Sequence, residues 1–344
     1  TNIAIDLTHP DYGNLYPEEL EEMRDLGEDI SLYEPRLNDL YVGHDTSNDR
    51  EKDQSVEANV DQTFSFVDTI KSPNGMMRFN VKDAAGKLFQ ITLSKRLHTQ
   101  ILRKNIFRKL GYKIPASKWL SGIKLSFKDN EQRDFFKGLQ IFASTSLSSD
   151  RWIRDVRDKE LYVQDLLIKD RSVINQTDLS VSAYNETYER RSLRSTLIPY
   201  SFVALNESVN AFSRSMTRLY DGNYIFKHFQ EETVFNASLD DIHWISRKLA
   251  KLSFNDIKDV VDDAHFPEPV DAIILEKLIY RRNHLLKTLL LKYEPLAVPE
   301  VKHKKYKNGF LKKIEFPYYA TNFTSDRMES PFDDLLTFGI AKGQ

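Results

Sequence analysis

Residues 87–111 read KLFQITLSKRLHTQILRKNIFRKLG, and within this stretch the apolar period changes from two residues to about 3.6. In the first part Phe89, Ile91 and Leu93 alternate with polar side chains, which is typical of a strand with one buried face. In the second part apolar residues recur at helical spacing, and Gly111 follows them, where a left-handed helix end favours glycine. The stretch therefore predicts a strand followed directly by a helix.

Two further β-type runs precede this stretch, over residues 63–70 and 77–83. Turn sequences separate the three runs: Ser-Pro-Asn-Gly at 72–75 and Asp-Ala-Ala-Gly at 83–86. Such turns between apolar runs are typical of hairpins. We therefore predict a three-stranded antiparallel meander that leads into the helix.

The residues after the helix predict a mixed and then a helical part. A strand over 119–127, a short helix over 131–138 and a strand over 139–144 come first, and a further short strand is predicted over 224–229. Further helices are predicted over 152–156, 193–205, 209–219, 238–252, 255–264 and 270–292. The predicted fold class is α+β, with a small antiparallel β-rich lobe at 63–145 followed by a larger, mainly helical lobe at 146–295.

Charge separates the N-terminal segment from the rest of the chain. Residues 1–62 hold seventeen Asp and Glu against four Lys and Arg, a net charge of −13, whereas the remainder carries +11. We interpret 1–62 as an acidic arm with a short helix at 17–27 and an exposed linker at 43–62. Opposite charges attract within a Debye length of about 8 Å. The arm either packs on the basic body or competes there with an anionic partner.

The segment 296–344 is predicted to be a basic and aromatic C-terminal extension. Its densest part, 302–313, contains no acid, and Tyr306 and Phe310 lie among its lysines. These lysines are Lys302, Lys304, Lys305, Lys307, Lys312 and Lys313. Such a segment can bind anionic phospholipid head groups, or less favourably a nucleic-acid backbone. The other interpretation is a solvated hairpin whose lysines neutralise the acidic arm.

Composition excludes several chemistries. The chain has no cysteine, which removes disulfides, cysteine-ligated zinc, iron–sulfur clusters and a cysteine nucleophile. It contains no phosphate-binding glycine loop, no His-Glu-x-x-His and no Gly-x-Ser-x-Gly motif. None of the eight histidines is paired at i,i+4, and His243 and His265 are interpreted as core or surface residues. No metal site is therefore predicted.

The order of the predicted strands and helices resembles that of a known group of proteins. Residues 107–115, FRKLGYKIP, are similar to the F-x-x-L-G-Y-x-V-P stretch that follows the αC-like helix of bacterial atypical kinases of the spore-coat-type (CotH-like) and HipA-like groups. Residues 244–252 and 270–285, the latter with Tyr-Arg-Arg-Asn at 280–283, resemble C-terminal helices of uncharacterised secreted members. The resemblance covers roughly residues 64–290. It implies a two-lobed, kinase-like arrangement.

The resemblance also implies positions for the groups of phosphoryl transfer. Such transfer needs a lysine on the phosphates, an acid that holds the lysine, and carboxylates or an asparagine on Mg²⁺. Lys95 lies nearest the lysine position, but Gln100 occupies the position of the helix acid. The region of the catalytic loop offers Glu207 and Asn210, although the expected aspartate falls near Val209 and the later asparagine near Arg214. The metal-binding acid falls near Glu231 or Glu232. Because several of the family's residues are replaced together, the resemblance implies a degenerate kinase fold that binds without transferring phosphate.

These observations lead to one expected function and two alternatives. We expect a non-catalytic binding or scaffold protein of a bacterial cell envelope, with a protein partner and no cofactor. The first alternative is an active atypical phosphotransferase that uses Mg-ATP. The second is a protein that binds an anionic membrane surface or nucleic acid through 302–313. The envelope or periplasm is the expected location, with the cytoplasm as the alternative; a secretion signal or lipid anchor upstream of Thr1 is left open.

Overall fold

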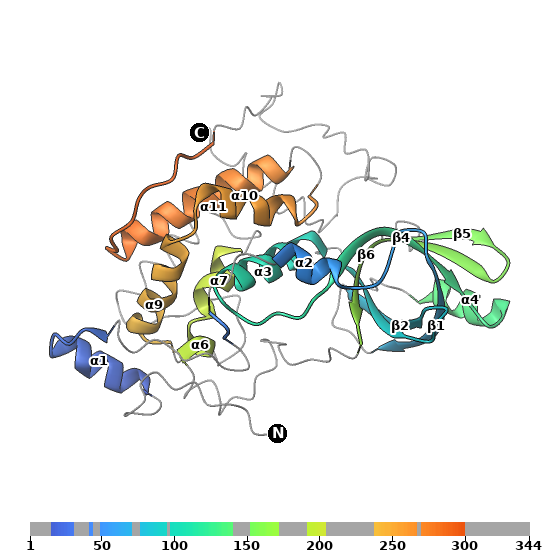
Figure 1. Ribbon diagram of the computed structural model, residues 1–344, viewed down its shortest axis with the longest axis horizontal. Helices are drawn as coiled ribbons and strands as arrows, with labels where there is room; N and C mark the ends of the chain where they lie inside the picture. The colour runs from blue at the N-terminus through green and yellow to red at the C-terminus, as the bar shows by residue number, and fades with distance from the viewer. Residues whose placement is uncertain are drawn as a thin grey trace.

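The computed structural model describes residues 15–30, 41–43, 49–70, 76–94, 97–139, 152–171, 191–203, 237–266 and 270–299. Within them the predicted α+β class is confirmed. A mixed sheet lies at one end of an elongated molecule and most of the helices lie at the other (Figure 1). None of the described helices is both long enough and apolar enough to cross a membrane.

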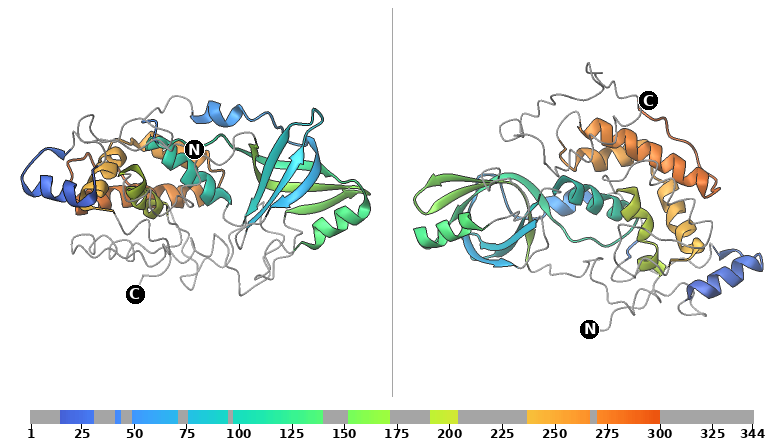
Figure 2. Two further views of the ribbon diagram at one scale, coloured as in Figure 1. Left: turned by 90° about the horizontal axis from the view of Figure 1, so that it is seen from below. Right: turned by 180° about the vertical axis from the view of Figure 1, so that it is seen from behind.

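The sheet has six strands and closes on itself. The strands are β1 Thr63–Ile70, β2 Met76–Lys82, β3 Leu88–Ser94, β4 Lys118–Ser126, β5 Ile153–Arg157 and β6 Glu160–Asp170. Their order is β3-β2-β1-β4-β6-β5, and β3 also pairs with β6, so five strands form a ring (Figure 2). β1 and β4 are parallel, and the other pairs are antiparallel. The predicted meander of the first three strands is confirmed.

Aromatic side chains fill the interior of the ring. Phe64, Phe79 and Phe89 are fully buried in this sheet core. The helix α4 (Asn130–Gly138) adds Phe136, whose ring centroid lies 5.1 Å from that of Phe79. Edge-to-face aromatic packing of this kind stabilises a core beyond the area that it buries. The sheet core is therefore closed at the end farthest from the helices (Figure 2).

A second core lies among the helices. The helices are α1 Pro17–Asp25, α2 Asp49–Gln54, α3 Leu97–Lys109, α6 Arg191–Arg194, α7 Leu197–Phe202, α9 Leu239–Ala250, α10 Phe254–Asp262 and α11 Val270–Thr288. The predicted apolar stripe of α3 is buried in this helical core. Ser238 and Ser253 cap α9 and α10, each with a capping box. Gly111, at φ +100, confirms the left-handed residue after α3.

Two parts of the chain differ from the sequence prediction. The helix predicted over 152–156 is wrong, because this segment forms β5 in a hairpin with β6. The strand β6 was not predicted, because Asp165 at φ +53 interrupts its alternation: Leu161 and Val163 are buried before it, Leu166 and Ile168 after it. One residue in the left-handed region shifts the phase of a strand. The closed sheet thus takes its last two strands from residues beyond 145.

The linker predicted over 43–62 is exposed at most of its described residues, Val60 among them, but it is not without structure. Residues 49–54 form α2, and Val56 and Ala58 are buried against the sheet core. The segment is polar in sequence, and these two apolar residues attach it to the body. The strand predicted over 139–144, apart from Leu139, and the elements predicted over 209–219 and 224–229 lie outside the described residues.

An aromatic ring covers a glycine on the outside of the sheet. The Tyr162 ring on β6 lies over Gly122 on β4, so that a β-carbon at position 122 would overlap the phenol. The Tyr162 hydroxyl donates to Asp61 Oδ1 at 2.8 Å, and the Asp61 N–H donates to the Gly122 carbonyl at 3.0 Å. These contacts fix the end of the acidic arm to the sheet.

We expect Gly122→Ala to lower the free energy of unfolding by about 1–3 kcal/mol, because the new methyl group displaces the ring and breaks its bond to Asp61. Urea unfolding at neutral pH measures this. In a Tyr162→Ala background the same substitution is expected to cost much less, because the ring is gone. An equal cost in both backgrounds would show that the ring does not cause the effect.

Two adjacent aspartates of α9 have different roles. Asp241 accepts from Arg194 Nε at 2.7 Å and from the Ser238 N–H at 3.0 Å. Asp240 is fully buried, its carboxylate accepts no hydrogen bond among the described residues, and Arg24 Nη1 lies 3.9 Å away. Burial raises the pKa of Asp240 to about 6, although Arg24 and Arg191 oppose the shift.

The burial of Asp240 predicts a dependence of stability on pH. The pKa of Asp240 is higher in the folded state, so its contribution to stability falls as the pH rises from about 4 through 6. Relative to the wild type, Asp240→Asn should therefore gain up to about 3 kcal/mol between pH 4 and pH 7.5. Urea unfolding at both pH values measures this. Asp241→Asn, the control, should be destabilised at both, and a pH-independent effect of Asp240→Asn would contradict the assignment.

Candidate functional site

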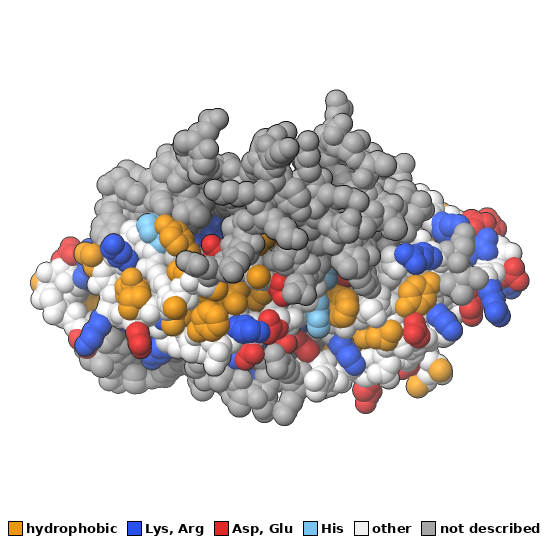
Figure 3. Space-filling view, turned by 90° about the horizontal axis from the view of Figure 1, so that it is seen from above, with side chains coloured by type: hydrophobic (Ala, Val, Ile, Leu, Met, Phe, Trp, Pro, Cys, Tyr) orange, Lys and Arg blue, Asp and Glu red, His pale blue; other side chains and the backbone are white. Residues whose placement is uncertain are grey.

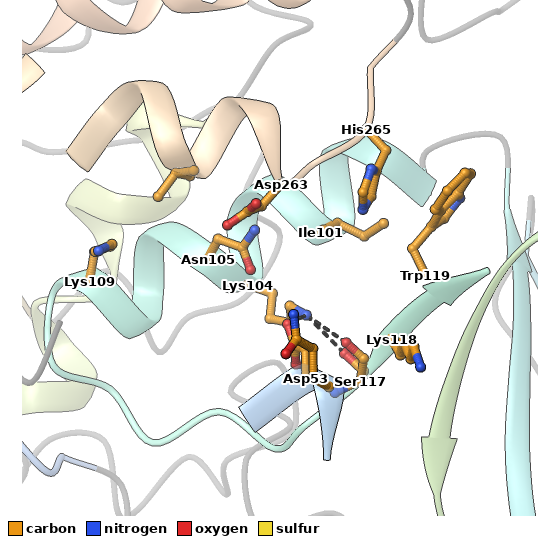
Figure 4. Close-up of a pocket in the computed structure, with 12 residues that line it drawn as sticks. Asp53, Ile101, Lys104, Asn105, Lys109, Ser117, Lys118, Trp119, Asp263 and His265 are labelled. Atoms are coloured by element: carbon orange, nitrogen blue, oxygen red, sulfur yellow. Dashed lines mark hydrogen bonds and ion pairs between the residues drawn. The ribbon is translucent and has the colours of Figure 1, made fainter. Parts of the chain in front are cut away.

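A cavity of about 290 Å³ lies where the closed sheet meets the helical core (Figure 4). Its walls come from α2, α3, the start of β4 and the end of α10. Figure 1 shows α2 and α3 in the middle of the molecule, between the sheet and the other helices. We call this space the junction cavity. It brings together residues far apart in the sequence, from Asp53 to His265.

One side of the cavity is a network centred on Asp53. The Lys104 ammonium group donates to the Asp53 carboxylate, to Ser117 O at 2.9 Å and to Ser117 Oγ at 3.2 Å. Arg108 Nη1 lies 2.9 Å from Asp53 Oδ1, which also accepts from the Ser117 N–H at 2.9 Å. Burial, together with Arg108, outweighs the opposing effect of Asp53 and lowers the pKa of Lys104 to about 8. We call these four residues the Asp53 network.

Two rings form another side of the cavity. Trp119 and His265 stack with their centroids 4.4 Å apart, and Figure 4 shows them next to each other. The Trp119 Nε1–H donates to Asp165 Oδ1 at 2.9 Å. His98 Nε2 lies 3.4 Å from the same oxygen, and His98 Nδ1 lies 2.9 Å from the Ala264 carbonyl. Burial lowers the pKa of His265, which favours its neutral form.

Backbone strain marks this side of the site. Asp165 has φ +53 and His265 has φ +57, and neither is a glycine. Such residues cost on the order of 1–3 kcal/mol each and concentrate at functional sites. The two lie on different elements yet both adjoin Trp119. Of the four non-glycine residues with positive φ among the described residues, two thus adjoin Trp119, which supports the junction cavity as the candidate site.

Two further lysines and two apolar side chains line the junction cavity. Among the described ranges, no group of three His, Asp or Glu side chains could hold a metal ion. Lys118 donates to the Ala58 carbonyl at 2.8 Å, and Lys109 Nζ lies 3.6 Å from Asp256 Oδ1. Ile101 and Val260 add apolar surface to the cavity. A small molecule entering here meets apolar walls, a lysine and the face of the Asp53 network.

The site residues predicted from the sequence all lie outside the part of the chain that the structure describes. Lys95, Glu207, Asn210 and Glu232 fall outside the described residues, and so does the whole lysine-rich segment 302–313. Gln100 is described, and its amide donates to Ser94 Oγ at 3.4 Å.

Sequence reasoning missed Asp53, Lys104, Lys118 and Trp119 as site residues. It placed His265 in the core or on the surface, whereas the ring is partly buried at the cavity. The one available signal was charge complementarity, since Asp53 belongs to the acidic arm and Lys104 to the basic face of α3. Charge alone does not identify the pair among the many acids and bases of these segments.

We expect Asp53→Ala to lower the free energy of unfolding by about 2–4 kcal/mol, because Lys104 and Arg108 would be left buried side by side without their acceptor. Urea unfolding measures the change. Glu57→Ala is the matched control, since the Glu57 carboxylate is 77 % exposed and, among the residues described, pairs with Lys87 alone. That change should cost less than about 1 kcal/mol. Equal costs would contradict a structural role of the Asp53 network.

Comparison with known proteins adds no relative. No protein-family model, no curated protein and no solved structure matches this chain.

Proposed function

We propose that this chain is a non-catalytic binding or scaffold protein of a bacterial cell envelope, built on a degenerate kinase-like fold with two lobes. The separate sheet core and helical core support the division into lobes. The succession of three strands, α3 and a helical remainder supports the kinase-like part of the proposal. The envelope is proposed from the resemblance to secreted bacterial proteins.

One observation supports the non-catalytic part of the proposal. The Ser117 hydroxyl and the Lys104 ammonium group of the cavity are hydrogen-bonded to each other within the Asp53 network. Ser117 supplies the one hydroxyl among the described lining residues, and its neighbour Lys104 is the candidate base. A lysine acts as a base only when it is neutral. The Asp53 carboxylate beside Lys104 favours the ammonium form, but burial outweighs it and lowers the Lys104 pKa to about 8. At pH 7 Lys104 is therefore still mainly an ammonium group, and it donates to Asp53 and Ser117 as a structural partner.

The surface supports a protein partner over a nucleic acid. On the face drawn in Figure 3, basic and acidic side chains of the described residues are interspersed, with hydrophobic side chains between them. A nucleic-acid site is expected to present a basic stripe or patch. A mixed surface with apolar spots is typical of protein interfaces.

The main alternative is an active phosphotransferase. Lys95, Glu207, Asn210 and Glu232 would then hold Mg-ATP, as the resemblance implies. The replacement of the helix acid by Gln100 speaks against it, because a neutral amide does not fix a lysine by charge. The binding role is therefore favoured.

Calorimetry of the full chain with Mg-ATP, followed by a phosphoryl-transfer assay, tests the proposal. We expect no saturable heat and no transfer, because the charged groups of phosphate binding are incomplete. Glu232→Gln is the matched control and should behave like the wild type. A micromolar dissociation constant that is lost in Glu232→Gln would overturn the proposal in favour of the phosphotransferase.

A further inference from the structure

Within the described part of the chain, Lys118 is the cation of the junction cavity that no carboxylate neutralises. Its ammonium group donates one hydrogen bond, to the Ala58 carbonyl at 2.8 Å. Across the described ranges no carboxylate pairs with it. By contrast, Lys104 is held by Asp53, and Lys109 lies beside Asp256. Lys118 thus keeps N–H groups that a ligand can use.

The position of Lys118 points to an anion. The ionic groups that line the cavity or pair with its lining residues are the cations Lys104, Arg108, Lys109 and Lys118 and the carboxylates Asp53, Asp256, Asp263 and Asp165, so the charges balance over the whole site. Asp53, Asp256 and Asp165 lie beside groups other than Lys118. Next to the Lys118 ammonium group a ligand of charge −1 is therefore favoured over a neutral or cationic one.

The other walls of the cavity favour a ligand with an apolar part. Trp119 stacked on His265 gives a flat aromatic wall, and Ile101 and Val260 add aliphatic contacts. The Asn105 amide makes no hydrogen bond with any described residue, so it can donate to or accept from a ligand. A volume of about 290 Å³ lies at the lower end of ligand sites and suits a small molecule.

We propose that the junction cavity binds a small organic anion, whose carboxylate pairs with Lys118 and whose apolar body lies against Trp119. The assignment rests on the proposed function in one respect: the site binds its ligand without reacting with it. Inorganic phosphate carries negative charge but has no apolar body. Comparing its binding with that of an organic anion therefore separates the contribution of the charge from that of the apolar contacts.

Titration of the full chain with benzoate, benzamide, benzylamine and inorganic phosphate tests the proposal, with tryptophan fluorescence and calorimetry as readouts. Trp152 and Trp244 are fully buried, so a change in fluorescence on binding is expected mainly from Trp119. Benzoate should bind saturably and at least about tenfold more tightly than benzamide, benzylamine or phosphate, because only benzoate offers both a negative charge and an aromatic body.

Two variants locate the binding. Lys118→Gln should weaken benzoate binding about tenfold and leave benzamide unchanged, because it removes the charge and keeps a polar side chain. Lys113→Gln is the matched control, since Lys113 is exposed and does not line the cavity. It should leave both ligands unchanged. Circular dichroism checks that each variant is folded.

The proposal is overturned if benzamide or benzylamine binds as tightly as benzoate, or if Lys118→Gln leaves benzoate binding unchanged. It is also overturned if no probe saturates below about 10 mM, a range within which weak specific sites are detected. These outcomes do not decide the proposed function, which fails only if the chain binds Mg-ATP and transfers phosphate. The ligand proposal and the proposed function can therefore fail independently of each other.

Discussion

The carboxylate of Asp53 joins three parts of the chain that are distant in sequence. It accepts from Lys104 and Arg108 on α3 and from the Ser117 N–H just before β4. Lys104 and Arg108 are both largely buried, so without the carboxylate their charges would repel each other in a medium that screens them poorly. The position of α2, the packing of α3 beside the sheet and one side of the junction cavity all depend on this interaction.

The same contact explains how the opposite charges of the two chain segments are used. Asp53, Glu57 and Asp61 of the acidic arm contact Lys104, Lys87 and Tyr162 of the body. Over residues 49–62 the arm therefore packs on the body. The competing interpretation, an arm that displaces an anionic partner, still concerns the parts of residues 1–48 that lie outside the description.

Two residues with left-handed backbone conformations adjoin Trp119. A left-handed residue inside β6 places the Asp165 carboxylate beside the Trp119 indole and the His98 imidazole. The left-handed His265 stacks on the other side of the same indole. The aromatic wall of the cavity is thus held by two backbone conformations that ordinary residues avoid, and such strain persists only where the surrounding packing determines it.

The sequence by itself determined the elements whose signals are local. The meander, α3 with its Gly111 end, and the capped helices α9 and α10 follow from alternation, helical spacing and cap residues within single windows. Only the tertiary structure decided the closure of the sheet through β6, the docking of Asp53 and the junction cavity. Each of these joins residues tens to hundreds of positions apart, and the left-handed Asp165 erases the local period of β6. A local sequence pattern cannot show which distant segment pairs with a given strand or which distant residue neutralises a buried charge.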